Sequence, residues 1–312
     1  MKKFFSLIFV LLIIASCILF YKYHQEIITY AVRLFTSNDK IKAPTNNDYH
    51  QDYDFELVKD VDNFSPQNKN DILNIIYTVL NSGTDEFSFY CENEYKNCID
   101  DINDLSNDKF SLSIINNLVS PYNSYSKLYI TTNDLGKVTI TMDKLYTEED
   151  IKNLNNKLDE IEKEIIKENM SNKDKIKSMH DYIINHSVYD SERANNIKSG
   201  NDANPKHQSH KANGPLLEGI SLCSGYSDAM KIYLDRLNLP NYKISNNDHI
   251  WNFVYLDGKW LHLDLTWDDP VTATNQNLLL HKFFLISTND LLKLDPSGHT
   301  FNEKYYPEAK SH

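Results

Sequence analysis

The chain has 312 residues, and its 32 Lys and Arg against 44 Asp and Glu give a formal net charge of −12 at pH 7. This length allows about two domains with a core that needs no metal or disulfide, and 41% hydrophobic residues exclude a disordered chain. The acidic balance argues against nucleic acid as the main partner, because phosphate binding needs clustered Lys and Arg. With only 8 Gly, Gly-rich nucleotide loops are not expected.

The N-terminus carries two lysines followed by an almost unbroken apolar run over residues 4–21. Such a run is at the lower limit for crossing a hydrocarbon core about 30 Å thick, and it is longer than the usual apolar region of a signal peptide, about 7–15 residues. Positive charge before the run and an acidic chain after it predict that the N-terminus lies inside and the bulk outside. We therefore expect residues 1–21 to be a membrane anchor in the cell membrane, with the folded part in the cell envelope. Lys22 and Arg33 weaken this orientation.

Two other interpretations of this segment remain open. The stretch Ile14-Ala15-Ser16-Cys17 resembles the lipobox of bacterial lipoproteins, which would make Cys17 the lipidated residue. Residues 18–20 stay apolar, however, whereas lipoproteins usually become polar directly after the cysteine. The third interpretation is a cleaved signal segment. All three predict that the folded part is extracytoplasmic.

The four cysteines do not have the same expected role. Cys91 and Cys98 lie in a polar stretch, and in an oxidising compartment they could close a small disulfide loop. Two unrelated thiols are the alternative. Cys223 is left without an evident partner, which marks it as a candidate reactive thiol.

The rest of the chain divides into three parts. Residues 22–70 are predicted to be a stalk, because residues 38–70 are polar. Residues 71–170 are predicted to form a small accessory α+β region, with a helix near 71–80 and a hairpin around the turn at 133–136. It ends in a long amphipathic helix with Thr147 as N-cap and apolar residues from Ile151 to Ile165 on one face.

A second helix, opened by Ser171, begins the third part, a predicted domain over residues 171–312. Residues 190–215 are predicted to be a loop. A stripe of apolar residues after position 228 then predicts a helix that starts at or just after Cys223. The helix dipole and the free backbone N–H groups at such a position favour a thiolate.

Two strands are predicted over residues 248–256 and 259–267, joined by the hairpin turn Asp257-Gly258. If these two residues form the loop, Leu256 faces Lys259 and Trp251 lies opposite Asp264. His249 is then a diagonal neighbour of Asp264 on one face, within reach of a side-chain hydrogen bond. The other face, with Ile250, Val254, Leu261, Leu263 and Leu265, is expected to be buried.

A cysteine at a helix start, a histidine and an aspartate are the parts of a nucleophilic triad. His249 would deprotonate Cys223, and Asp264 would orient the imidazole and stabilise its protonated form. An acyl-thioester would result. The backbone N–H of Cys223 is the candidate oxyanion donor.

These residues resemble the bacterial transglutaminase-like superfamily. The matching pieces are Leu222-Cys223-Ser224-Gly225-Tyr226-Ser227, His249-Ile250-Trp251-Asn252, Asp257-Gly258-Lys259-Trp260 and Asp264-Leu265-Thr266-Trp267-Asp268-Asp269-Pro270. The resemblance implies an α+β, papain-like core, in which a helix carrying Cys223 packs on an antiparallel sheet carrying His249 and Asp264. Ser224 is a departure, because many relatives carry Gln after the nucleophile.

Other polar and aromatic residues are weaker candidates for the functional site. Trp251, Trp267 and Tyr226 are candidates for the substrate cleft, with burial in the core as the alternative for the tryptophans. His262 is expected to have a structural role opposite Phe253. The pair His207 and His210 lacks a third ligand at a convincing spacing, so we expect no metal and no cofactor. His180 and Asp181 are expected to be structural.

The resemblance implies a cysteine acyltransferase or protease, and with the N-terminal segment we expect it to be extracytoplasmic and to act on protein or cell-wall peptide amides. The thioester can be resolved by an amine or by water, and the triad is common to both reactions. The alternative function is a catalytically silent binding or scaffolding module, anchored at the surface with the same fold.

Overall fold

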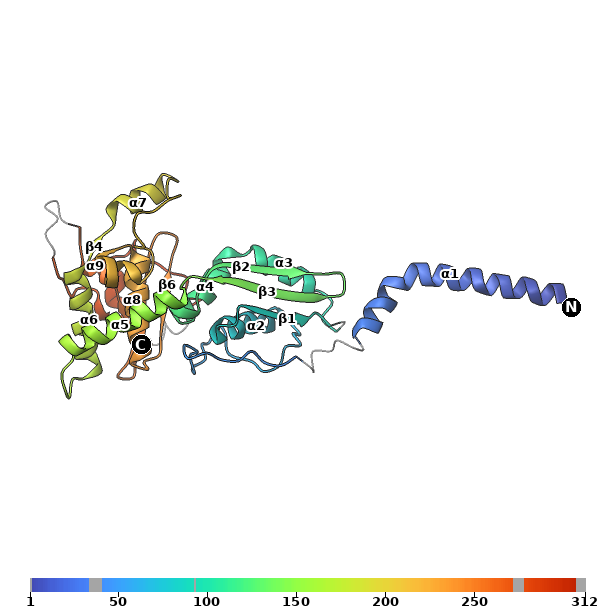
Figure 1. The fold of residues 1–312 in the computed structure, drawn as a ribbon, viewed down its shortest axis with the longest axis horizontal. Helices are drawn as coiled ribbons and strands as arrows, with labels where there is room; N and C mark the ends of the chain where they lie inside the picture. Colours follow the sequence, from blue (N-terminus) through green and yellow to red (C-terminus); the bar gives the residue numbers. More distant parts are fainter. Residues whose placement is uncertain (1, 34–40, 93, 272–277, 307–312) are drawn as a thin grey trace.

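The computed structural model describes residues 2–33, 41–92, 94–271 and 278–306 (Figure 1). Its first elements are α1 (Lys2–Arg33), α2 (Lys69–Ser82), β1 (Glu86–Tyr90), α3 (Cys98–Asn107), α4 (Lys109–Leu118), η2 (Pro121–Asn123), β2 (Tyr125–Thr132), β3 (Lys137–Lys144) and α5 (Glu148–Ile165). Then follow α6 (Asn172–His186), β4 (Val188–Tyr189), α7 (Ser191–Lys198), η3 (Gly214–Glu218), β5 (Ile220–Ser221), α8 (Cys223–Arg236), β6 (Asn241–Ser245), β7 (Ile250–Leu256), β8 (Lys259–Leu263), α9 (Leu265–Asp268), β9 (Phe284–Ile286) and α10 (Thr288–Leu294).

The fold is α+β, as expected, and its two larger sheets are antiparallel. One sheet has the strand order β1-β3-β2, and the other has the order β6-β7-β8-β9. A short parallel pair, β4-β5, leads directly into α8. In Figure 1, α2, α3 and α4 with the first sheet lie between α1 and the part that holds α8.

The N-terminal residues form α1, which extends away from the rest of the chain (Figure 1). Within the described ranges, no helix combines the length and the apolar character that crossing a membrane requires. Cys17 is exposed on this helix as a free thiol. The anchor, the lipoprotein and the cleaved signal stay predictions.

Residues 41–68 run alongside the first sheet and α2 without forming a helix or a strand. Three of their apolar side chains, those of Phe55, Val58 and Phe64, are buried in a core that also holds the apolar face of α2. This part of the predicted stalk therefore packs against the folded body. The stalk was predicted from the polar composition of the segment, and that composition gave no indication that these three residues are buried.

The helices predicted in this half of the chain are confirmed. Thr147 begins α5 with a capping box, in which its hydroxyl accepts the N–H of Asp150 and the Asp150 carboxylate accepts that of Thr147. The side chain of Ser171 likewise caps α6. The hairpin β2–β3 closes over residues 133–136 as predicted. The sequence analysis did not anticipate β1, α3 and α4, and α7 forms inside the predicted loop.

The sheet β6–β9 is buried on both faces, which differs from the expected single buried face. Trp251 and Phe253 belong to one hydrophobic cluster, together with residues of α2, α3 and α4. Val254 and Leu263 belong to a second cluster, together with residues of α5, α6 and α8. Because side chains alternate along a strand, the accessory region covers the face that carries Trp251 and Phe253, in addition to the face that was predicted to be buried.

Candidate active site

The backbone brings Cys223 to the first position of α8, as predicted. Residues 220–221 pair in parallel with Val188 and Tyr189, and the N–H of Leu222 then donates to the carbonyl of Ser209 at 2.8 Å. Cys223 follows as the first residue of a 14-residue helix, and it is a partly exposed free thiol. Its backbone N–H is among those that a helix leaves without an internal partner.

Side-chain hydrogen bonds attach this helix start to the strand that follows His249. The hydroxyl oxygen of Ser227 lies 2.7 Å from the carbonyl oxygen of Cys223 and 2.9 Å from that of Ile250. The side-chain amide of Asn252 donates to the carbonyl oxygen of Ser227 at 2.9 Å. The nucleophile and the histidine strand are therefore held in a fixed relation.

His249 lies directly before β7, between the candidate nucleophile and a carboxylate. Its Nε2 atom is 2.5 Å from Oδ2 of Asp264, and Cys223 is close enough to contribute to the raised pKa of His249. Trp251 stacks under the imidazole, with the two rings inclined by 18°. The three predicted triad residues therefore lie together, with His249 bonded to Asp264.

The electrostatic setting favours a proton on His249. Burial alone would lower the pKa of His249, but the charge and hydrogen bond of Asp264 outweigh it, and with the contribution of Cys223 the pKa rises to about 10. Burial alone would raise the pKa of Asp264, but its bonds to His249 and His299 hold it well below the usual range. Asp264 is thus ionised, and His249 can hold the proton of the thiol.

The route by which Asp264 reaches this position differs from the prediction. The hairpin register is confirmed, since Leu256 pairs with Lys259 and Phe253 with His262. However, β8 ends at Leu263, so the expected pairing of Trp251 with Asp264 across the ladder does not form. The strand stops because Oδ1 of Asp264 accepts the N–H groups of Thr266 and Trp267, at 2.8 and 3.2 Å, and so begins α9.

Of the three residues predicted to line the cleft, only Trp267 is accessible. Its side chain is 38% exposed and meets the His249 ring edge-on, with the ring centroids 6.3 Å apart. Trp251 and Tyr226 are each 1% exposed, so both belong to the core. Tyr226 donates its hydroxyl hydrogen to Oδ2 of Asp269 at 2.6 Å. Burial of their large apolar rings explains this correction.

His262 has the structural position that the sequence analysis expected. It is fully buried, its Nδ1 accepts the indole N–H of Trp251 at 3.0 Å, and its Nε2 lies 2.9 Å from the hydroxyl of Thr288. It therefore fixes the orientation of the tryptophan that supports His249.

His299 is a further histidine of the site that the sequence did not predict. Its Nε2 atom lies 2.8 Å from Oδ2 of Asp264, the same oxygen that bonds to His249. It follows α10, in a segment without strand or helix periodicity. The sequence shows only a lone histidine four residues after Asp295, and this pattern does not by itself indicate a functional site.

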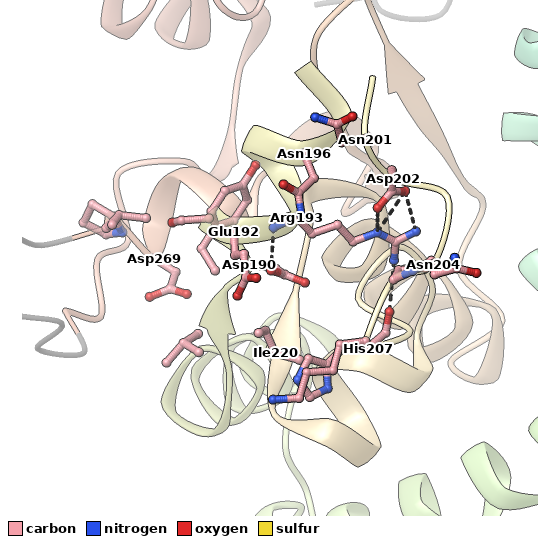
Figure 2. Close-up of a pocket in the computed structure, with 17 residues that line it drawn as sticks. Asp190, Glu192, Arg193, Asn196, Asn201, Asp202, Asn204, His207, Ile220 and Asp269 are labelled. Carbon is pink, nitrogen blue, oxygen red and sulfur yellow. Dashed lines mark hydrogen bonds and ion pairs between the residues drawn. The ribbon is translucent and has the colours of Figure 1, made fainter. Parts of the chain in front are cut away.

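A cavity of about 510 Å³ opens beside the site (Figure 2). It is lined by residues 188–193, 196, 201–202, 204–207, 220 and 269–271. Tyr189 is part of this lining, and burial and then the charge of Cys223 raise the pKa of Tyr189 to about 12. In Figure 2 the guanidinium of Arg193 forms an ion pair with the carboxylate of Asp202, and Nε donates to Oδ1 at 3.0 Å.

Two groups of side chains in the described ranges have the donor types of a metal site. They are His180, Asp181 and His281, and His249, Asp264 and His299, with the ligand atoms of each group within 4.8 Å of one another. In both groups the ring nitrogens bond to carboxylate oxygens, so a metal would have to displace these hydrogen bonds. His180 also bonds to the buried Asp268 through Nε2 at 3.3 Å, which ties α6 to the end of α9.

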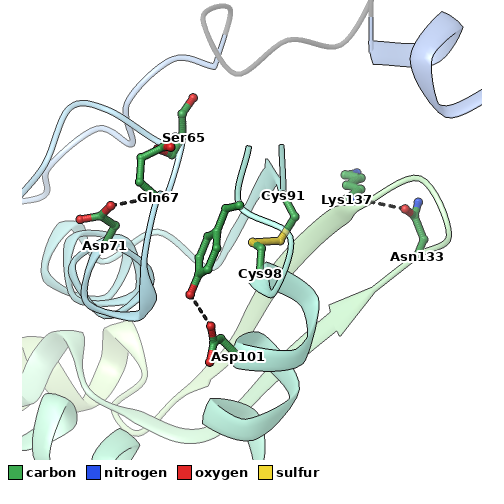
Figure 3. Close-up of a disulfide and its surroundings, with 9 residues drawn as sticks. Ser65, Gln67, Asp71, Cys91, Cys98, Asp101, Asn133 and Lys137 are labelled. Atoms are coloured by element: carbon green, nitrogen blue, oxygen red, sulfur yellow. Dashed lines mark hydrogen bonds between the residues drawn. A yellow bond between two sulfur atoms is a disulfide. The ribbon is translucent and has the colours of Figure 1, made fainter. Parts of the chain in front are cut away.

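Of the two alternatives for Cys91 and Cys98, the disulfide is the one that forms. Cys91 and Cys98 form a disulfide at the start of α3, with Cα atoms 5.7 Å apart (Figure 3). Close to it, the hydroxyl of Tyr95 donates to the Asp101 carboxylate.

His207 and His210, the two histidines of the predicted loop, have different hydrogen-bond partners. Nδ1 of His207 lies 3.2 Å from Oε2 of Glu218, and Nδ1 of His210 lies 2.8 Å from Nη1 of Arg193.

Comparison with known proteins gives partial structural matches. The chain is similar to the crystal structure of a TGase, with 20% identity and a TM-score of 0.35, covering 46% of this chain and 44% of that one. It is also similar to a protein named as a candidate cysteine protease from Cytophaga hutchinsonii, with 12% identity and a TM-score of 0.26, covering 45% of this chain and 61% of that one. No protein-family model matches the chain. No curated protein matches it either.

Proposed function

We propose that the protein is a transglutaminase-like cysteine enzyme that forms an acyl-thioester on the amides of proteins or peptides. One observation carries this proposal: His249 is hydrogen-bonded to a buried, ionised Asp264, and it interacts with the Cys223 thiol, which contributes to its raised pKa. An unpaired thiol at a helix start with an oriented base beside it is the arrangement that nucleophilic catalysis requires.

In the proposed reaction, His249 takes the proton of the Cys223 thiol, and the sulfur attacks the carbonyl carbon of a substrate amide. The C–N bond then breaks, and His249 returns the proton to the departing amine. An acyl-thioester on Cys223 remains. A second amine gives transamidation and water gives hydrolysis, and the backbone N–H of Cys223 is suited to stabilise the oxyanion in either case.

The proposed location is outside the cytoplasm, with residues 1–21 as an anchor. The disulfide between Cys91 and Cys98 supports this proposal, because such bonds persist in oxidising compartments. Protein and cell-wall peptides are the proposed substrates. In this scheme residues 171–312 are the catalytic domain and residues 71–170 are an accessory region that covers one face of its sheet.

A thiol-reactive probe tests the proposal. We expect iodoacetamide to alkylate Cys223 in the full chain at pH 6–7 faster than it alkylates the exposed Cys17. Cys223→Ala should abolish the fast reaction, His249→Ala should slow it at least tenfold, and Cys17→Ala is the matched control that leaves it in place. A rate at Cys223 that is indifferent to His249 would favour the catalytically silent scaffold.

The outcome of the reaction needs a separate assay. The full chain is incubated with a Gln-containing peptide and a primary amine, and the products are identified by mass spectrometry. An amide product indicates transamidation, and the free acid alone indicates hydrolysis. Cys223→Ala is the control for uncatalysed reaction.

A further inference from the structure

The Asp264 carboxylate has a second histidine partner outside the triad. His299 is fully buried, with Nε2 at 2.8 Å from Oδ2 of Asp264 and Nδ1 at 2.8 Å from Oδ2 of Asp295. The described contacts thus form a chain of five side chains, Cys223, His249, Asp264, His299 and Asp295. The second half of this chain has no part in the proposed reaction.

The geometry determines which atoms of His299 carry protons. The pKa of Asp264 lies well below its usual range, as described above. Burial would raise the pKa of Asp295, but the backbone N–H of Gly298 and the imidazole of His299 lower it. Both carboxylates are therefore ionised and can only accept hydrogen bonds. The form of His299 that satisfies both carboxylates is the one that donates from both ring nitrogens, and that form carries a positive charge.

The surroundings of His299 suit a fixed cation. Its ring lies against Phe283 with an interplanar angle of 18°, and edge-on to Trp251 and Trp267 with centroids 4.9 and 5.0 Å away. The faces of aromatic rings attract a cation, and these three rings exclude water from around it.

The backbone around His299 is attached to the backbone of His249. The side-chain amide nitrogen of Asn246 donates to the carbonyls of Gly298 and Thr300, on either side of His299, at 2.8 and 3.0 Å. The amide oxygen of Asn246 accepts the N–H of His249 at 2.9 Å. One side chain therefore fixes the two histidines relative to each other.

Gly298 permits this close packing. A Cβ atom at residue 298 would lie 2.3 Å from Oδ2 of Asp295 and 3.0 Å from the Trp267 ring. The segment can thus approach Asp295 only with glycine at this position.

We propose that His299, held by Asp295, is a positioning residue that fixes the Asp264 carboxylate from the side opposite His249 and places a positive charge behind the triad. This proposal rests on the proposed function. With Oδ1 held by the N–H groups of Thr266 and Trp267, and Oδ2 shared between two imidazoles, the carboxylate cannot rotate. Asp264 also divides its charge between two cations, which limits how strongly it holds the proton on His249.

The charged groups that face His299 are Asp264, Asp295 and His249, whose ring centroid is 5.3 Å away. Removing the positive charge of His299 stabilises the protonated forms of its neighbours. On the acid side of its pH profile, the rate of Cys223 alkylation rises with pH, and the midpoint of this acid limb should therefore move to higher pH. A purely structural defect would instead lower the rate at every pH and leave the midpoint in place.

The experiment measures the rate of Cys223 alkylation by iodoacetamide between pH 4 and 9 in the full chain. His299→Gln keeps a neutral N–H donor toward Asp264, so we expect the midpoint of the acid limb to rise by about half a pH unit or more, with a plateau rate within about threefold of wild type. His299→Ala removes the donor as well, and we expect its plateau to fall about tenfold or more. His186→Gln, on the exposed end of α6, is the matched control and should leave the midpoint in place.

The outcomes separate this proposal from the proposed function. If wild-type alkylation does not depend on His249, the proposed function itself fails. If it does depend on His249, but His299→Gln leaves the midpoint where it is in wild type, the positioning role is overturned. The proposal does not depend on the folding of His299→Ala, because His299→Gln by itself decides the charge effect.

Discussion

The hydroxyl oxygen of Ser227 lies 2.9 Å from the carbonyl oxygen of Ile250. Ser227 follows Cys223 by one helical turn, and Ile250 follows His249 by one residue. This contact sets the separation of the helix that holds the thiol from the strand that positions the imidazole. A catalytic distance is thus fixed by groups that do not react.

We therefore expect Ser227→Ala to lower the rate of Cys223 alkylation about threefold to tenfold, because a small displacement of the base weakens proton transfer. The free energy of unfolding should fall by about 1 kcal/mol, as one buried hydrogen bond is lost. Iodoacetamide kinetics and urea unfolding measure the two effects. Ser199→Ala at the exposed end of α7 is the control, and equal alkylation rates in the two variants would contradict the role of Ser227.

Gly225 is placed where the first turn of α8 meets a loop. A Cβ atom on it would lie 2.3 Å from the carbonyl oxygen of Ser209 and 2.6 Å from the hydroxyl of Ser221. Gly225→Ala should therefore displace the helix start, reduce Cys223 alkylation at least tenfold and destabilise the fold by about 1–3 kcal/mol. Gly200→Ala is the control, because a Cβ atom at Gly200 would meet no atom within 4 Å while its φ is +75°. It therefore measures the backbone cost of replacing a glycine and should leave the alkylation rate unaffected.

The pKa of His249 gives a stability effect with a defined direction. The pKa rises from 6.5 to about 10 on folding, so the folded protein binds the proton more tightly than the unfolded chain. The stabilisation is complete below pH 6.5 and is lost as the pH rises through 10. It is on the order of a few kcal/mol, because one pKa unit corresponds to about 1.4 kcal/mol.

His249→Gln should accordingly be less stable than wild type at pH 6, and the difference should shrink between pH 7 and pH 10. Urea unfolding of both proteins at pH 6, 8 and 10 measures it. A difference that is constant with pH would show that His249 contributes through packing and not through its charge.

The sequence predicted the parts of this site that follow a local rule. Asp257 and Gly258, with φ of 51° and 82°, form the turn that sets the β7–β8 register, and the apolar stripe after residue 228 places Cys223 at a helix start. The sequence could not show where the strand ends. The strand ends where the Asp264 side chain forms hydrogen bonds with nearby backbone N–H groups, and these bonds take the place of the strand ladder.

His299 illustrates what periodicity cannot reveal. It reaches Asp264 through tertiary packing of a segment that is neither helix nor strand, and Asn246 holds that segment from 52 residues away in the chain. The burial of Phe55, Val58 and Phe64 was missed for the same reason. A polar composition predicts exposure on average, whereas three apolar residues are sufficient to anchor the segment.

The disulfide between Cys91 and Cys98 closes a loop with a sequence separation of 7, and both residues are buried in the first core. Closing so short a loop lowers the entropy of the unfolded chain by an amount worth about 2–3 kcal/mol. We expect a Cys91→Ser, Cys98→Ser variant to be less stable than wild type by about this amount in urea unfolding. Cys17→Ser is the control, and a variant with the wild-type midpoint would contradict a stabilising disulfide.

A buried ion pair joins α8 to the sheet behind the nucleophile. Lys243 on β6 and Asp228 on α8 are 5% and 2% exposed, with Nζ and Oδ1 2.5 Å apart, and the hydroxyl of Tyr146 donates to the other carboxylate oxygen at 2.7 Å. Lys243→Met leaves the Asp228 charge buried without its cation, so we expect a loss of about 3–5 kcal/mol. Adding Asp228→Asn removes that charge and keeps an acceptor for Tyr146, and it should restore more than half of the loss. Urea unfolding of the wild type, the two single variants and the double variant gives the coupling energy directly. If the double variant is as unstable as the sum of the two single changes, the pair does not act as a unit, and the loss in Lys243→Met comes from packing alone.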